Sequence, residues 1–166
     1  MYNKPLAYFI TFTAYATWLH GDFRKSIVVE NHSTKLIEPQ ESFFRHEQQK
    51  LKYPVVMFDG KMRRAILEAI MERCLWKQWH LYAAHVRSNH VHVIVNSTEP
   101  IDKVMASLKA WATRKLRQSG YNLPKVWTRH GSTKYIFTRA KLIEKIRYVV
   151  YEQGETMAHY IDPAFE

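Results

Sequence analysis

The chain has 166 residues, a length typical of one globular domain, so we expect a single domain over residues 1–166. Its composition, with 46% apolar residues and only 5 glycines and 6 prolines, excludes a disordered or collagen-like chain. Lysine and arginine outnumber aspartate and glutamate by 25 to 15, which gives a formal charge of +10 and favours a polyanionic partner such as nucleic acid.

The single cysteine, Cys74, excludes an intrachain disulfide framework and a multi-cysteine zinc site, and it fits a reducing compartment. No stretch reaches the roughly 18 apolar residues that span a bilayer, and residues 1–5 do not lead into a signal-peptide hydrophobic region. We therefore expect a cytoplasmic protein with no membrane partner.

The first half of the chain predicts a strand, a long insertion and a helix. Residues 6–15 are aromatic and β-branched in alternation, which indicates the strand. From about residue 19 to 60 the periodicity fades, so we expect an irregular insertion in which residues 40–51 could form a short helix. Apolar positions three and four apart then predict an amphipathic helix over Lys61 to Trp79.

The second half predicts a hairpin, a helix, an extended segment broken at Gly131-Ser132, and a last helix; these span residues 80–87 with 90–95, then about 102–119, 126–137 and 140–153. Without the last helix, this order is the βαββαβ arrangement of ferredoxin-like folds. We therefore predict an α+β fold: an antiparallel sheet with its first and third strands in the centre, and an added C-terminal helix free to cover the second face.

A histidine pair lies in the predicted third strand. His90 and His92 are two residues apart, so they present two imidazoles on one face, while Val91, Val93 and Val95 face the helices. Two nitrogen ligands on a rigid strand form half of a metal site. A hydrogen-bonded histidine pair without a metal is the alternative.

Other classes that place histidines on strands fit less well. A histidine-triad hydrolase needs a third histidine where Ile94 stands, and a two-histidine phosphoesterase needs two separated His-x-Thr/Ser units. A structural zinc finger needs cysteines that the chain does not have.

The last helix carries a second set of polar residues. Gln153 falls on its apolar, sheet-facing stripe and needs a partner there, whereas Tyr148 and Glu152, one turn apart, share a more exposed side. An ideal helix does not put Tyr148 and Gln153 on the same side. Core packing is the alternative role for the tyrosine.

Together with the segment Val126 to Gly131, which contains Trp127, these motifs resemble the single-tyrosine HUH transposases, which move insertion sequences as single-stranded DNA, and their REP-associated relatives. Asn89-His90-Val91-His92 matches the His-hydrophobe-His motif. The resemblance covers about the whole chain in element order, but only the histidine pair and the tyrosine helix are specific to the family. The family's fold is a ferredoxin-like sheet with the nucleophile on the last helix.

The resemblance implies that the Tyr148 hydroxyl, or less favourably that of Tyr151, attacks a DNA phosphodiester to give a 5′-phosphotyrosine and a free 3′-hydroxyl. It also implies a divalent ion, Mg²⁺ or Mn²⁺, bound by His90, His92 and an amide four residues after the tyrosine. That position holds Glu152, and the glutamine follows one residue later. We favour Gln153 because it falls on the sheet-facing stripe, but Glu152 matches the spacing and the face of Tyr148, so both stay as possible ligands.

The implied partner is single-stranded DNA that forms hairpins, and related transposases act as dimers that exchange the tyrosine helix, so a homodimer is possible. The residues that we nominate for DNA contact are Arg114, Lys115, Arg117, Arg129, His130 and Lys134, with Trp18, Trp127 and Tyr135 as possible stacking platforms. The alternative functions are a catalytically inactive nucleic-acid-binding module on the same fold and a phosphodiesterase that uses water.

Overall fold

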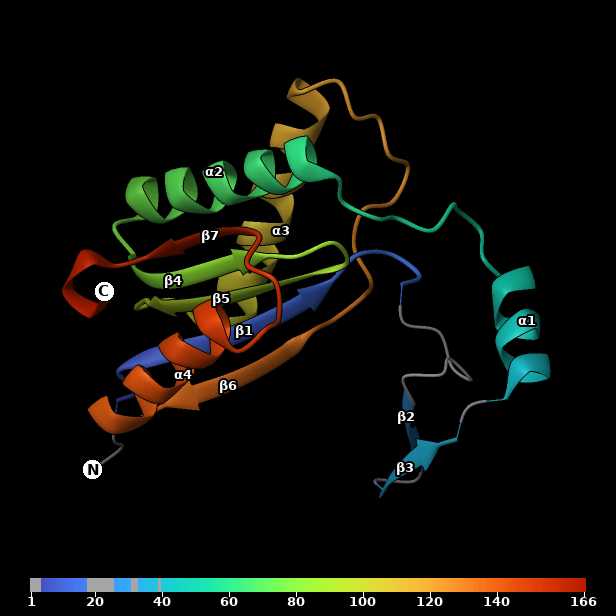
Figure 1. Cartoon of the computed structure of the whole chain (residues 1–166), viewed down its shortest axis with the longest axis horizontal. Helices are drawn as coiled ribbons and strands as arrows, with labels where there is room; N and C mark the ends of the chain where they lie inside the picture. Colours follow the sequence, from blue (N-terminus) through green and yellow to red (C-terminus); the bar gives the residue numbers. More distant parts are fainter. Residues whose placement is uncertain (1–3, 18–25, 31–32, 39) are drawn as a thin grey trace.

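The centre of the molecule is a five-stranded antiparallel sheet in the order β6-β1-β5-β4-β7 (Figure 1). The computed structural model describes residues 4–17, 26–30, 33–38 and 40–166. The main elements are β1 (Ala7–Thr13), α2 (Gly60–Lys77), β4 (His80–Val86), β5 (His90–Asn96), α3 (Ile101–Gln118), β6 (Ser132–Ile136), α4 (Arg139–Tyr151), β7 (Ala158–Ile161) and a 3-10 turn at Pro163–Phe165.

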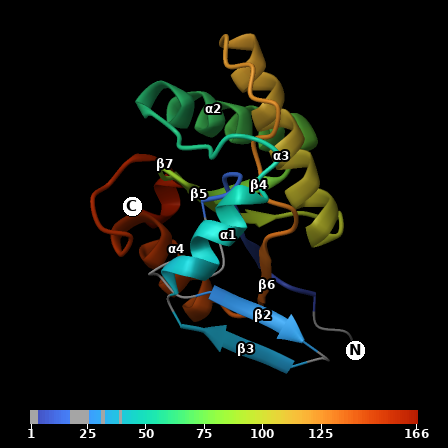
Figure 2. The same cartoon turned by 90° about the vertical axis from the view of Figure 1, so that its right-hand side faces the viewer.

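The helices cover the two faces of this sheet unequally. Helices α2 and α3 lie on one face and α4 lies on the other, as Figures 1 and 2 show. The first and third strands of the βαββαβ unit, β1 and β5, are central. The predicted α+β, ferredoxin-like fold with an added C-terminal helix is therefore confirmed.

Alternation along β5 divides the core into two layers. Val91, Val93 and Val95 are buried with the apolar sides of α2 and α3, whereas Ile94 is buried with α4. The histidines share the face of Ile94, so α4 is the helix that approaches them. This arrangement follows directly from the period of two along the strand.

Helix α2 has a capping residue at each end. The Asp59 carboxylate accepts the Met62 N–H at 2.8 Å, and Gln78 ends the helix in the left-handed conformation with φ 55°. Cys74, on its inner side, is buried, and this burial raises the pKa of the thiol to about 12. A thiol in that environment is a packing group.

The insertion is more regular than predicted. Strands β2 (Ser26–Glu30) and β3 (Ser33–Ile37) pair as a separate two-stranded sheet, and α1 (Glu41–Gln49) occupies the place of the expected short helix. Figure 1 shows these elements to one side of the main sheet. The prediction of an irregular segment was wrong for β2, where Ile27, Val28 and Val29 form a β-branched run that favours a strand.

Strand β7 was not predicted from the sequence; its four residues pair with β4 at the edge of the sheet. In contrast, the break expected at Gly131-Ser132 is present. A Cβ on Gly131 would lie 2.6 Å from the Met105 Sδ and 2.6 Å from the Thr11 carbonyl oxygen, so only glycine permits this approach to β1. Among the described helices, none is both long and apolar enough to cross a membrane.

Candidate active site

His90 and His92 lie side by side on β5, with ring centroids 4.8 Å apart. Strand β5 is held by β1 on one side and β4 on the other, and His92 is opposite Thr11 and His85 in these two ladders. The backbone that presents the two imidazoles is therefore fixed on both sides, as a metal site requires.

Each imidazole has a partner that orients it. The Nδ1 of His90 lies 2.7 Å from the Asn89 Oδ1, so Nδ1 carries the proton and the lone pair is on Nε2. The Nδ1 of His92 lies 2.7 Å from the Thr11 hydroxyl, which can donate or accept. Burial, reinforced by the charge of His90, lowers the pKa of His92 to about 3. His92 is therefore neutral at neutral pH, which is the form that binds metals.

Tyr148 approaches the pair from α4. Its ring centroid lies 6.0 Å from that of His92 and 6.1 Å from that of Phe9, and its side chain is half-buried. Val149 and Val150 anchor the helix in the core directly after it. Tyr151, the alternative nucleophile, has a side chain that is 61% exposed.

The end of α4 explains how Gln153 reaches the same site. The helix ends at Tyr151 and Glu152 caps it with φ −105° and ψ 16°, so Gln153 lies beyond the helix. The Gln153 Nε2 donates to the Tyr148 carbonyl at 3.3 Å, and its Oε1 then faces the His92 Nε2 at 3.2 Å. Glu152 is exposed. Because the helix stops, the ideal-helix argument against pairing Tyr148 with Gln153 does not apply.

The groups gathered around His92 are a second imidazole, that of His90, and the amide oxygen of Gln153. No group of three or more His, Cys, Asp or Glu side chains that could hold a metal occurs in the part of the chain that the structure describes. An N,N,O set from His90, His92 and Gln153 fits a divalent ion that keeps several positions for water and phosphate oxygens. The residues present are thus compatible with Mg²⁺ or Mn²⁺.

His85 was not assigned a role from sequence, yet it connects β4 to the tyrosine helix. It is fully buried; its Nδ1–H donates to the Val149 carbonyl at 2.7 Å, and its Nε2 accepts the Met157 N–H at 3.0 Å. Burial lowers the pKa of this imidazole. A histidine inside the apolar run of β4 needs two partners, and that was the signal available in the sequence.

The basic residues nominated for DNA contact lie in three places: on α3, on β6 and in the loop before Gly131. Arg114, Lys115 and Arg117 lie on α3, behind the sheet as seen from the histidines, and the Lys115 Nζ is already 2.7 Å from the Glu72 carboxylate. Lys134 lies opposite Phe9 on β6, which puts it on the face of the histidines.

Arg129 and His130 are exposed in the loop before Gly131. The Lys109 ammonium holds this loop by donating to the carbonyls of Thr128 and His130.

The three aromatic candidates also differ. Trp127 is buried and its Nε1 donates to the Lys109 carbonyl at 3.1 Å, so it takes the core-packing role and not the stacking role. Tyr135 is 54% exposed, and its ring makes a T-shaped contact with that of Tyr8. Trp18 lies outside the described residues.

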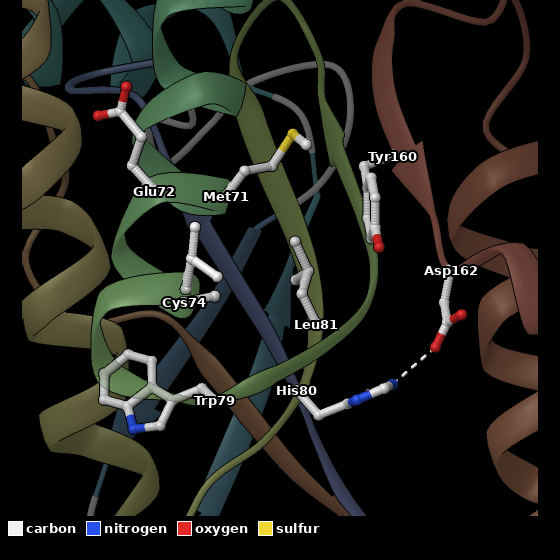
Figure 3. Close-up of a pocket in the computed structure, with 9 residues that line it drawn as sticks. Met71, Glu72, Cys74, Trp79, His80, Leu81, Tyr160 and Asp162 are labelled. Atoms are coloured by element: carbon white, nitrogen blue, oxygen red, sulfur yellow. Dashed lines mark hydrogen bonds and ion pairs between the residues drawn. The ribbon is translucent and has the colours of Figure 1, made fainter.

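A cavity of about 420 Å³ lies away from these residues, between α2 and the edge formed by β4 and β7 (Figure 3). Its walls are largely apolar and include Met71, Leu81 and Tyr160. His80 and Asp162 also line it, and the His80 Nε2 lies 2.6 Å from the Asp162 carboxylate. None of the predicted site residues lines this cavity.

Comparison with known families gives a match over residues 48–151, well over half of the chain, to the model described as "Transposase IS200 like". The chain belongs to the family of IS200-like transposases. The resemblance to single-tyrosine HUH transposases is therefore confirmed, and with it a transposase-like role in DNA processing. The match contains His90, His92 and Tyr148 but starts at residue 48, near the end of the insertion, so β1 lies outside it.

A solved structure agrees with this family in fold. The transposase chain matches "Structure of the REP associates tyrosine transposase bound to a REP hairpin" with a TM-score of 0.50 and 11% identity, over 92% of this chain and 69% of the other. At that identity, the match shows a shared fold alone. No curated protein matches the chain.

Proposed function

We propose that this IS200-like transposase cleaves and rejoins single-stranded DNA, with Tyr148 as the nucleophile and residues 1–166 acting as one domain. The observation that carries the proposal is the convergence of Tyr148 and Gln153, from the end of one helix, on the His92 ring. A phenol can act as the nucleophile, and two imidazoles with an amide oxygen can hold the ion, in metal-assisted phosphoryl transfer.

The proposed step is a transesterification. The Tyr148 oxygen forms a bond to phosphorus while the bond from phosphorus to the 3′-oxygen breaks; the proton lost by the phenol is balanced by the proton gained by the 3′-oxygen. The products are a 5′-phosphotyrosine and a free 3′-hydroxyl. Because the phosphoester bond is conserved, attack by a 3′-hydroxyl can rejoin the strands without ATP.

His90, His92 and the Gln153 Oε1 would hold the ion. A bound Mg²⁺ or Mn²⁺ supplies charge that polarises the phosphate. The chain's own contribution is orientation: Asn89 and Thr11 fix the imidazoles, and the Tyr148 carbonyl fixes the Gln153 amide.

We further propose that the substrate is single-stranded DNA with a hairpin. The net charge of +10 supports a polyanionic ligand, and the solved transposase with the same fold is described as bound to a REP hairpin. The nominated contacts nearest the site are Lys134, on the face of the sheet that carries the histidines, and Arg129 and His130, in the loop before Gly131. The residues on α3, Arg114, Lys115 and Arg117, would contact DNA only if the DNA also passes α3.

The test is an adduct assay. A pool of 3′-end-labelled, hairpin-bearing single-stranded oligonucleotides is incubated with the full chain and Mn²⁺, and then denatured. We expect a labelled protein–DNA adduct that is lost in Tyr148→Phe and kept in the control Tyr151→Phe. Cleavage without an adduct would support a water-using phosphodiesterase, and salt-sensitive binding alone would support an inactive module.

A further inference from the structure

Lys145 lies one turn before Tyr148 on α4, and its side chain is 22% exposed. Its Nζ is 5.0 Å from the centroid of the Tyr148 ring and 5.7 Å from that of Phe9. Both distances are within the range of cation–π interactions, and these interactions place the ammonium beside the ring of the proposed nucleophile.

The neighbouring Glu144 carboxylate pairs mainly with Lys141 and less closely with Lys145. Both oxygens of Glu144 lie 2.8 Å from the Lys141 Nζ, whereas the Lys145 Nζ is 3.7 Å from one of them. Lys141 is therefore a surface ion-pair partner, and Lys145 keeps its charge directed over two aromatic rings. The two lysines offer a matched comparison on one helix.

The position of Phe9 ties Lys145 to the histidine pair. The Phe9 ring contacts those of His92, at 5.6 Å, and Tyr148, at 6.1 Å. Lys134 is opposite Phe9 on β6 and shares its face. Two lysines therefore place positive charge on the side of the site where Tyr148 lies. This charge would add to that of a metal ion held by the histidines.

We propose that the Lys145 ammonium contacts the scissile phosphate and stabilises the charge that develops on its non-bridging oxygens as the Tyr148 oxygen bonds to phosphorus and the 3′-oxygen leaves. The proton balance is that of the transesterification above, and Lys145 stays protonated throughout. This inference rests on the proposed function. Pre-positioned charge of this kind is worth most where water is partly excluded.

The experiment compares Lys145→Met, Lys145→Arg and the control Lys141→Met on an oligonucleotide that the unaltered chain cleaves, in single-turnover adduct formation with Mn²⁺. We expect Lys145→Met to slow the reaction about 100-fold, the scale of one lost electrostatic donor, and Lys145→Arg to recover most of the rate. Mn²⁺ affinity and the thermal unfolding midpoint should be unchanged, and Lys141→Met should react at the normal rate.

A second substrate separates a phosphate contact from a packing role. With a methylphosphonate at the cleaved position, one charged oxygen is absent, so the rate ratio between the unaltered chain and Lys145→Met should fall towards one. An unchanged ratio, or a Lys145→Met variant as fast as Lys141→Met, would overturn the inference while leaving the proposed function intact. If the unaltered chain forms no adduct with the ordinary phosphodiester oligonucleotide, both the inference and the proposed function are overturned.

Discussion

At the scale of single residues, two side-chain amides hold the histidine pair in place. Asn89 fixes His90, and Gln153 lies between His92 and the Tyr148 carbonyl. The position of Gln153 was ambiguous in the sequence because periodicity describes a continuing helix and says little about where its last turn opens. The Glu152–Gln153 choice therefore depended on a helix end that only the structure provides.

The two alternatives can be separated by metal binding. We predict that Gln153→Ala lowers Mn²⁺ affinity about tenfold or more, since an oxygen ligand is removed, and that Glu152→Ala leaves it nearly unchanged, because Glu152 is exposed beyond the helix. Isothermal titration of the metal-free chain with Mn²⁺ measures both. The reverse order of effects would assign the ligand to Glu152.

At the scale of elements, strongly periodic segments were predicted well and short or non-local ones were not. The histidine strand and the helices that became α2 and α3 follow from alternation and helical spacing within the chain. Strand β7 has four residues, and its pairing with β4 is a tertiary contact that no local pattern announces. The same limit applies to His85, whose partners lie on α4 and just before β7.

His85 and His92 also link these elements to pH. Burial lowers the pKa of both imidazoles in the folded chain, whereas an exposed histidine titrates near 6.5. Below about pH 6.5, the unfolded chain binds protons that the folded chain does not. We therefore predict that the free energy of unfolding, measured with urea in EDTA, is constant just above pH 6.5 and falls from there to pH 5, by up to about 1.4 kcal/mol per pH unit for each histidine.

Two variants test the source of this slope. Replacing His85 by glutamine removes one of the two groups and should reduce the slope, while replacing His46, which is exposed on α1, should not. A stability that stays constant from pH 7 to pH 5 would contradict the assignment of two buried neutral imidazoles.

At the scale of the whole molecule, the candidate site is assembled within one chain. Helix α4 packs on the sheet of its own chain and brings Tyr148 to the His92 of that chain. A homodimer that exchanges tyrosine helices is thus not needed to complete the proposed site.

This arrangement predicts the result of a mixing experiment. Tyr148→Phe and His92→Ala should each form no adduct, and an equimolar mixture of the two should also form none, because no chain in it has both groups. Labelled oligonucleotide and denaturing gels measure this directly. Recovered adduct in the mixture would show that the tyrosine acts in trans.

The most direct measurement is the identity of the residue that becomes joined to DNA. After reaction with the oligonucleotide pool and Mn²⁺, the adduct is digested with nuclease and protease and its peptides are mapped by mass spectrometry. The account predicts a nucleotide attached through its 5′-phosphate to Tyr148. A nucleotide on Tyr151 or on any other residue, or cleaved DNA with no modified peptide, would contradict it.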